Sequence, residues 1–429
     1  MMIQSNAEPT KDYLMQLLKN KDINKYDRLQ NYYEGKSDIY YRELDKSKPN
    51  NRIMNNFAGY IVDIMQGYFI GKPVSYTGMD ESLLENLTVI NEYNDEQSHN
   101  SEIAKQIGIK GKAYEILYTD EEAKIRFAKV DPEQVVMVYD NKITPDPLFA
   151  VYSYKIDDIE YVELYTRNEI MKYKYEEGKL AEIFEMDGIT YPADHFFGGV
   201  PINEYTNNDE EQGDFEKVIS LIDAYDLMQS DSVNDFEQFA DAYLKLIGMR
   251  GTEPEDVAQM KQDRVLLLDD NGQADWLIKT VNDTHVENIK NRLQTDIHRF
   301  SKTPNLTDDA FGSNLSGVAI SYKILGMESA ASNKERRFKK SLQRRIELIC
   351  NILNIQGNNF DYMDVKMNFT RNLPINVKEQ VEIAQMLLGM TSQQTSLAQL
   401  PMVDDVTEEL ERLEEEQGEI RLTLPQDEV

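Results

Sequence analysis

Two segments within residues 214–300 decide the fold of this chain. They read DFEKVISLIDAYDLMQSDSVNDFEQFADAYLKLI at 214–247 and NDTHVENIKNRLQTDIHRF at 282–300. In both, apolar residues recur at gaps of three and four, which places one apolar stripe along one face of an α-helix. The first helix would be about 50 Å long, at about 1.5 Å per residue. The second is expected to end at Thr303-Pro304, because proline cannot continue a helix interior. We therefore expect two long helices that form a rod.

A small insert, residues 248–281, separates the two predicted helices. Its strongest signal is Asp269-Asp270-Asn271-Gly272, a composition typical of a hairpin turn. The flanking segments, Arg264–Leu268 and Ala274–Lys279, are expected to be its two strands. The only tryptophan, Trp276, lies on the second of them.

Residues before the rod are expected to be helical up to about residue 110 and β-rich from 113 to 205, because the apolar period changes there from three-and-a-half to two. The predicted helices are Lys11–Lys19, Ile23–Tyr33, Ile53–Phe69, Asp80–Tyr93 and Ser101–Lys110. The predicted strands are Ala113–Tyr118, Lys124–Val130, Gln134–Tyr139, Leu148–Lys155, Glu160–Arg167, Ile170–Tyr175 and Leu180–Met186.

After the rod comes a polar loop, Thr303–Ser316, followed by a helix of about 38 residues from Gly317 to Asn354. A strand at Asp364–Arg371 and two helices, Val377–Leu388 and Val406–Gly418, are expected to complete the chain. The fold class is therefore α+β and predominantly helical.

The composition limits what this protein can bind. The chain has 429 residues, enough for about three domain-sized units. Its net charge is −31, from 46 basic and 77 acidic residues, which argues against a general nucleic-acid binder. The charge still permits a surface past which DNA slides without sticking. The single cysteine, Cys350, excludes an internal disulfide framework and a cysteine zinc site. The sequence contains no apolar run of 18 residues, so it predicts no membrane span.

Motifs for catalysis, cofactors and metals are missing from the sequence. There is no phosphate-binding glycine loop and no nucleophile elbow. The adjacent acids Asp308-Asp309 do not by themselves indicate a nuclease, and solvated loop acids explain them better. No two of the four histidines have metal-ligand spacing; they are His99, His195, His285 and His298. We expect no enzymatic activity, no cofactor and no metal.

The first predicted long helix carries eight acidic residues against Lys217 and Lys245. One interpretation is an exposed face that keeps the protein soluble. The other is a channel wall that repels phosphates. The candidate wall residues are Asp223, Asp226, Asp231, Asp235, Glu237 and Asp241.

A second charge anomaly is a basic run on the long helix that follows the polar loop. It holds seven basic residues against one acid, Glu335. A basic helix in an acidic chain indicates a subunit interface or plain surface, or else direct contact with DNA. The residues are Lys334, Arg336, Arg337, Lys339, Lys340, Arg344 and Arg345.

Four sets of residues match a known protein family, and they occur in the same order as in that family. The sequence resembles the portal proteins of tailed bacteriophages, of the siphophage type. The matching stretches are Asn51–Phe57 with Gly67–Val74, Val200–Tyr205, Leu221–Tyr225 with Ser230-Asp231 and Asn234-Asp235, and Phe311–Ile320 with Lys334–Arg336.

The resemblance implies a ring of about twelve copies around a DNA channel, at one vertex of a capsid. It also implies names for the parts of the chain. These are an N-terminal helical segment 1–50, a wing 51–213 that is β-rich over 113–205, a first stem helix 214–247, a clip 248–281, a second stem helix 282–300, a tunnel loop 301–316, a long wing helix and strand 317–374, and a crown with an acidic tail 375–429.

The implied function is the packaging, retention and ejection of double-stranded DNA, in a virion assembled in the host cytoplasm. The implied partners are terminase, a head-completion adaptor, the major capsid protein and scaffold, with no membrane. Residues expected to touch DNA in the tunnel loop are Lys302, Asn305, Asp308, Asp309, Phe311 and Asn314. Residues expected to contact terminase or adaptor in the clip are Glu253, Glu255, Arg264, Asp270 and Trp276.

Two alternatives remain open at this point. One is another oligomeric virion protein, an adaptor or scaffold without a DNA channel. The other is a nuclease that uses scattered acidic residues such as Asp308 and Asp309.

Overall fold

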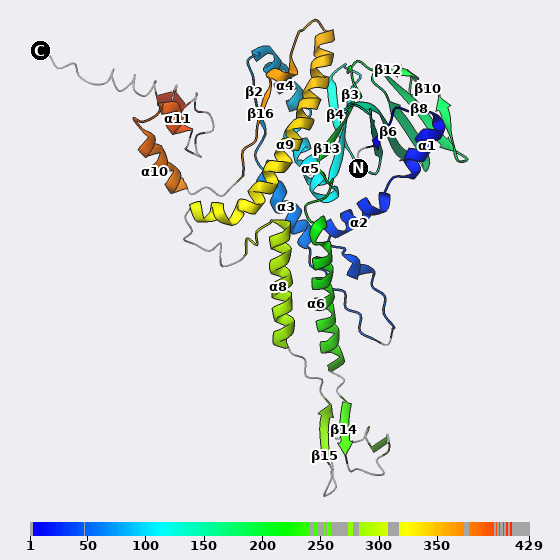
Figure 1. Cartoon of the computed structure of the whole chain (residues 1–429), viewed down its shortest axis with the longest axis vertical. Coiled ribbons are helices and arrows are strands. Elements are labelled where there is room, and N and C mark those ends of the chain that lie inside the picture. The colour runs from blue at the N-terminus through cyan, green and yellow to red at the C-terminus, as the bar shows by residue number, and fades with distance from the viewer. Residues whose placement is uncertain are drawn as a thin grey trace, which may run out of the picture.

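The structure is a computed structural model, and it shows a body from which a pair of long helices projects (Figure 1). A two-stranded hairpin lies at the far end of the helix pair, and two short C-terminal helices lie to one side of the body. The residues it describes are 3–46, 48–239, 243–247, 253, 255–256, 258, 273–277, 283–307, 317–372, 377–398, 400, 403, 406, 409–410 and 412–413.

Five helices form the first part of the body. Their bounds are α1 Lys11–Lys19, α2 Ile23–Tyr33, α3 Phe57–Ile70, α4 Glu81–Tyr93 and α5 Glu96–Lys110. The prediction that α3 begins at Ile53 was wrong by one turn, because Asn56 caps the helix by accepting a hydrogen bond from the Gly59 backbone N–H. Helix α5 starts five residues before its predicted start at Ser101.

Two sheets hold most of the strands, and both are antiparallel except for the parallel pair of β1 with β5 in the larger one. The larger has the order β1-β5-β6-β7-β8-β12, with β9 paired to β8, and the smaller has the order β13-β3-β4. Helix α1 packs its Leu14 and Leu17 against one face of the larger sheet. The strands of the larger sheet are β1 Ile3–Gln4, β5 Val135–Tyr139, β6 Pro147–Ile156, β7 Ile159–Tyr165, β8 Glu169–Glu176, β9 Lys179–Ile183 and β12 Ala193–Asp194. Those of the smaller sheet are β3 Lys112–Thr119, β4 Ile125–Val130 and β13 Ile202–Thr206.

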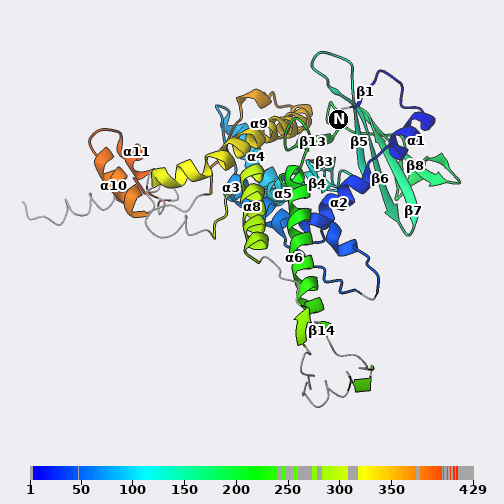
Figure 2. The same ribbon diagram turned by 60° about the horizontal axis from the view of Figure 1, so that its bottom comes forward.

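The long helix α9, Gly317–Ile355, crosses the body beside the smaller sheet (Figures 1 and 2). Phe338 and Leu342 pack with α3, α5 and β13, and Ile346 and Ile349 pack with α4 and β4. Because one stripe of α9 joins two apolar clusters, this helix holds the body together. A short antiparallel pair connects the chain after α9 to the first helices; its strands are β2 Ser75–Thr77 and β16 Lys366–Asn368. A separate small hairpin consists of β10 Glu185–Met186 and β11 Ile189–Thr190.

The projecting pair consists of α6, Ile219–Phe239, and α8, Asp283–Ser301, with a short 3₁₀ turn at Glu216–Val218 before α6. The prediction of one helix from 214 to 247 was wrong at its far end. Residues Tyr243–Ile247 form strand β14, which pairs antiparallel with β15, Gln273–Leu277. Strand pairing overrides helical periodicity here because YLKLI also suits a strand. The predicted strand Arg264–Leu268 lies outside the described residues.

The C-terminal part contains α10, Val377–Leu387, and α11, Gln393–Leu397. Most of the predicted helix Val406–Gly418 lies outside the described residues. Of the helices that the structure describes, none is long and apolar enough to cross a membrane.

Candidate functional site

The helix pair is rooted in an apolar cluster of the body. Phe215 and Val218 just before α6, and Ile222 in its first turn, are buried with Ile297 of α8 and with residues of α2 and α3. Burial of apolar surface at the root stabilises both helices where they leave the body. Farther along, the pair extends away from the body (Figure 2).

Three acidic side chains of α6 bind other parts of the same chain. Asp223 accepts a hydrogen bond from the Tyr32 hydroxyl at 2.5 Å. Asp226 is completely buried and accepts hydrogen bonds from the Ser37 hydroxyl and from the Asn55 backbone. Burial raises the pKa of both carboxyl groups above the usual range. Asp231 pairs with Arg42 at 2.7 Å.

The placement of Asp226 contradicts its predicted role in a channel wall, because a completely buried carboxylate presents no charge to a passing ligand. Asp223 and Asp231 also serve contacts within the chain. Asp235 is half-buried and Glu237 is exposed, so their role in a channel wall stays a prediction. Asp241 lies outside the described residues.

The segment after α8 is fixed to the body at its start. The His298 ring Nδ1 lies 3.1 Å from the Thr303 carbonyl oxygen, and Thr303 is buried. The Tyr60 hydroxyl donates to the Pro304 carbonyl at 3.0 Å and accepts from the Leu306 backbone N–H at 2.9 Å. The predicted loop at 301–316 therefore has a firmly held first part.

Of the predicted loop residues, Lys302 is exposed and Asn305 is half-buried. The Asn305 side chain accepts hydrogen bonds from the backbone and the hydroxyl of Thr307, which turns it towards its own loop. Asp308, Asp309, Phe311 and Asn314 lie outside the described residues.

Lys302 has a φ of 61°, in the left-handed region that favours glycine, directly after the last turn of α8. We expect Lys302→Gly to raise the free energy of unfolding by about 1 kcal/mol, because glycine adopts this conformation without a Cβ clash. Denaturant unfolding would measure the change. Lys323→Gly, inside helix α9, is the matched control and should lower stability. A loss of stability in Lys302→Gly would contradict the prediction.

The predicted partner-binding residues belong to the insert between α6 and α8, and one of them, Trp276, lies on the hairpin at the far end of the pair. On β15, the backbone of Trp276 pairs with that of Leu244 on β14. Glu253 and Glu255 are exposed. Arg264 and Asp270 lie outside the described residues, so partner contact by the hairpin stays a prediction.

The basic run of α9 divides into buried and surface residues. The side chains of Lys334 and Arg345 are 3% and 2% exposed, and both bind acids of the same chain. The prediction of a subunit interface or a DNA contact was therefore wrong for these two residues. Lys334 pairs with Asp214 at 2.8 Å, just before the helix pair begins.

The other five basic residues of the run lie at or near the surface. Arg336 and Lys340 are exposed, and Arg337, Lys339 and Arg344 are half-buried. The last three form ion pairs with Asp209, Glu335 and Glu347 respectively. For these five, the choice between interface, plain surface and DNA contact stays open.

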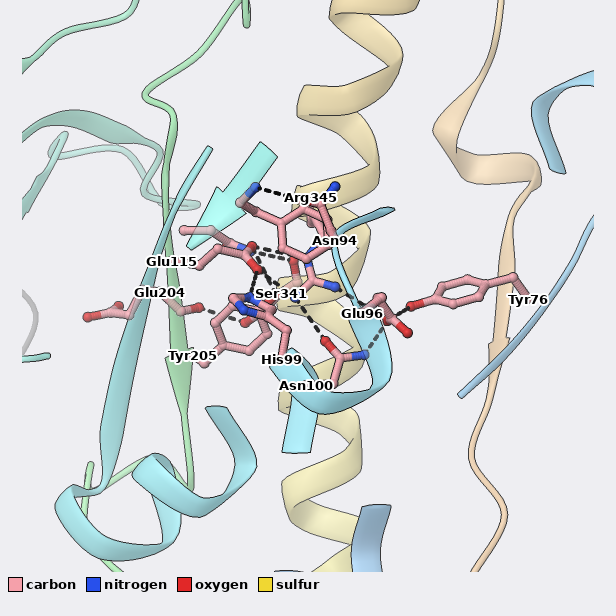
Figure 3. Close-up of polar contacts among 12 residues, drawn as sticks. Tyr76, Asn94, Glu96, His99, Asn100, Glu115, Glu204, Tyr205, Ser341 and Arg345 are labelled. Carbon is pink, nitrogen blue, oxygen red and sulfur yellow. Dashed lines mark hydrogen bonds and ion pairs between the residues drawn. The ribbon is translucent and has the colours of Figure 1, made fainter. Parts of the chain in front are cut away.

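Arg345 is the centre of a buried polar cluster that joins α9 to α5, β3 and β13 (Figure 3). Its guanidinium donates to both oxygens of Glu115, at 2.5 and 3.1 Å, and to the Asn100 side chain at 2.9 Å. Glu115 is also 2.7 Å from His99 Nε2 and accepts from the Tyr205 hydroxyl at 3.2 Å. Glu115 is completely buried, and burial would raise its pKa, but the charge of Arg345 and the hydrogen bond with His99 hold that pKa at about 2.

A second polar clasp joins the chain after β16 to α9 and α3. Arg371 binds Glu328 at 3.0 Å and Glu335 at 2.8 Å, and the Tyr68 hydroxyl also donates to Glu328. Sequence reasoning missed both this clasp and Glu115. The signal for Glu115 was a lone acid inside a strand, KAYEILYT, whose other residues are mostly apolar.

The described residues contain no group of three or more potential metal ligands. The described residues show a projecting helix pair, an anchored segment directly after α8 and a two-stranded hairpin at the tip. Comparison with known proteins identifies the family that has this arrangement. The family model described as "Phage portal protein, SPP1 Gp6-like" matches residues 18–421. The chain belongs to this family of phage portal proteins.

Two curated portal proteins are similar over most of their length. The portal protein of Bacillus phage SPP1 is 26% identical over 443 residues, which cover 97% of this chain and 85% of that protein. The portal protein of Clostridium phage phiCD119 is 26% identical over 436 residues, with 92% and 93% covered. The predicted family is therefore confirmed, and with it the function of a phage portal, a virion component that provides the channel for DNA.

Proposed function

We propose that this portal chain assembles into a ring of about twelve copies in which α6 and α8 line the DNA channel. The observation that carries the proposal is the projecting helix pair, rooted in the body and tipped by a β-hairpin (Figure 1). A channel through several copies needs such a rigid element from each copy. In this arrangement α6 and α8 are the stem and the hairpin is the clip.

The remaining parts take the roles that the family resemblance implies. The body, including α9, is the wing, and α10 and α11 belong to the crown. The clip binds terminase during packaging and the head-completion adaptor afterwards, while the wing meets the capsid and scaffold proteins. Each copy carries a net charge of −31, which discourages phosphates from sticking to the ring.

The segment between Thr307 and Gly317 is the proposed tunnel loop. Its two flanks are the anchored end of α8 and the first residue of α9, so it starts beside the root of the stem. Lys302 and Asn305 lie on the anchored side of this loop. The proposal places the loop where DNA enters or leaves the stem.

The first test is the native mass of the purified protein, with end-on images of the particles. The expected mass is near twelve or thirteen times 49.7 kDa, with an open axial hole. A ring that is closed at its axis would contradict the channel and favour a structural protein without a DNA passage.

Deleting Asp308–Asn314 is expected to leave ring assembly intact and to reduce the DNA packaged or retained per capsid. The physical reason is that the deletion removes the loop while leaving the anchoring contacts of Tyr60 in place. The DNA content of purified particles measures the effect. Normal DNA content with the deletion would overturn the tunnel-loop assignment.

A further inference from the structure

An extended segment, residues 50–55, runs along one face of α6, and we call it the strap. It lies between the N-terminal helices and α3, which starts at Phe57. The helix residues it contacts follow more than 170 positions later in the chain. Two stretches singled out from the sequence, Asn51–Phe57 and Ser230–Asp235, therefore meet in space.

The strap and α6 match in register. Every second backbone N–H of the strap donates to a side chain of α6, and the acceptors are four residues apart. The three pairs are Asn55 N with Asp226 Oδ1 at 2.9 Å, Ile53 N with Ser230 Oγ at 2.9 Å, and Asn51 N with Asn234 Oδ1 at 2.7 Å.

The register has a simple geometrical cause. Two residues of extended chain rise about 6.6 Å. Four residues of α-helix rise about 6.0 Å. The two repeats nearly coincide, so hydrogen bonds can form at three successive positions without distortion of either segment. We call these three pairs the ladder.

Further contacts make the ladder rigid. The side-chain amides of Asn55 and Asn51 donate to the same acceptors as their backbones, at 2.9 and 3.0 Å. Arg42 donates to the Asn51 carbonyl at 2.8 Å while it pairs with Asp231 at 2.7 Å. All three acceptor residues are buried, at 0%, 0% and 7% exposure. Removing one of these acceptors leaves a strap N–H without its protein partner, which costs the free energy of an unmade hydrogen bond.

The ladder begins where the apolar root of α6 ends. The buried apolar residues of α6 at the root extend to Ile222, with Tyr225 packed beside them. The next two turns of α6 carry the three ladder acceptors, Asp226, Ser230 and Asn234. Apolar contact is non-directional, whereas hydrogen bonds require defined distances and angles, so the ladder fixes the rotation of the helix about its own axis.

We propose that the ladder sets the rotation and tilt of α6 in the DNA channel, and that Asp226, Ser230 and Asn234 are positioning residues for DNA passage. The proposal rests on the proposed function, in which α6 and α8 line the passage. The ladder face of α6 then points away from the DNA. Exposed apolar positions beside this face include Leu227 and Phe236, and the proposal puts at least one of them on the channel side.

The test uses two substitutions in the full-length protein. Ser230→Ala removes the acceptor of the Ile53 N–H, and Asn234→Leu removes the acceptor of the Asn51 N–H. Asn234→Asp keeps an acceptor oxygen and is the conservative variant. Ser232→Ala is the matched control, because within the described part of the chain the Ser232 hydroxyl binds the Met228 carbonyl of its own helix, at 2.7 Å, and not the strap.

Hydrogen–deuterium exchange of the strap is the first measurement. We expect the Ile53 backbone N–H to exchange about fivefold to tenfold faster in Ser230→Ala. The Asn51 backbone N–H should exchange faster by about the same factor in Asn234→Leu. Asn234→Asp and Ser232→Ala should exchange like the unaltered protein. Unchanged exchange in Ser230→Ala would overturn the ladder.

The DNA content of capsids that contain a normal number of portal copies is the second measurement. Ser230→Ala and Asn234→Leu are expected to package severalfold less DNA, and Asn234→Asp to restore packaging. A ladder that served only folding would leave packaging normal once the portal is incorporated. Faster strap exchange with normal packaging would therefore overturn the positioning role.

A separate experiment tests the proposed function on which this inference rests. Photoreactive amino acids at Leu227 and Phe236, with the strap unaltered, should crosslink to DNA in filled capsids from at least one of the two positions. The absence of a crosslink from both would refute the stem assignment, while the exchange results would still report on the ladder.

Discussion

Arg345→Met is expected to lower the free energy of unfolding by about 3–5 kcal/mol, the range for a broken buried ion pair. The methionine keeps much of the volume of the arginine, so the loss comes from charge rather than from a cavity. Glu115 would lose both of its hydrogen bonds from the guanidinium, at 2.5 and 3.1 Å, and would remain completely buried. Asn100 would lose its bond from Arg345 as well.

Denaturant unfolding of the variant measures this loss. The control is Arg336→Ala on the same helix, where the side chain is exposed and the expected change is within about 0.5 kcal/mol. The double variant Arg345→Met with Glu115→Gln should recover part of the stability, because the charge of Glu115 is then removed; the recovery is incomplete because buried Glu96, 3.4 Å from Arg345, also loses its cation. A loss below about 1 kcal/mol in Arg345→Met would contradict the role given to the cluster.

The cluster matters for the channel because of where α9 lies. One end of α9 follows the proposed tunnel loop, and Arg345 fixes the other part of this helix to α5, β3 and β13 (Figure 3). Lys334, between them, pairs with Asp214, which lies just before the helix pair begins. Weakening α9 is therefore expected to reduce the yield of assembled portals as well as their stability.

The elements that the sequence predicted best are those whose signals are local. The bounds of α1 and α2 agree with the predicted ranges, because Thr10 and Asp22 cap these helices from the adjacent positions. The apolar stripe of α9 likewise predicted a helix from Gly317 to within one residue of its end. Apolar periodicity and helix caps depend on residues that are close together in the sequence, so they can be recognised without knowing any distant partner.

The parts that could not be predicted depend on partners far along the chain. The strap meets α6 more than 170 residues away, and Arg345 meets Glu115 at a separation of 230. A charged residue on a helix looks the same in sequence whether it faces solvent or a buried acid. For that reason Asp226 and Arg345 were assigned to surfaces, although both are buried.

Acid is expected to destabilise the unaltered protein more steeply than the Glu115→Gln variant. The pKa of Glu115 is about 2 in the fold, against an ordinary value of 4.5. The ionised carboxylate therefore stabilises the fold fully above pH 4.5, and this contribution disappears as the pH falls from 4.5 to 2. A shift of this size corresponds to about 3 kcal/mol of unfolding free energy.

The measurement is the free energy of unfolding at several pH values between 4.5 and 2, for both proteins. Glu115→Gln starts from a lower stability at neutral pH, since its amide cannot balance the charge of Arg345, but its curve should be flatter by about 3 kcal/mol over this range. The raised pKa of Asp226 acts in the opposite direction, yet it is common to both proteins and cancels from the difference. Glu121→Gln, at an exposed turn, should follow the unaltered protein. Parallel curves for the unaltered protein and Glu115→Gln would mean that the buried pair does not hold the carboxylate ionised, and the large loss expected for Arg345→Met would lose its physical basis.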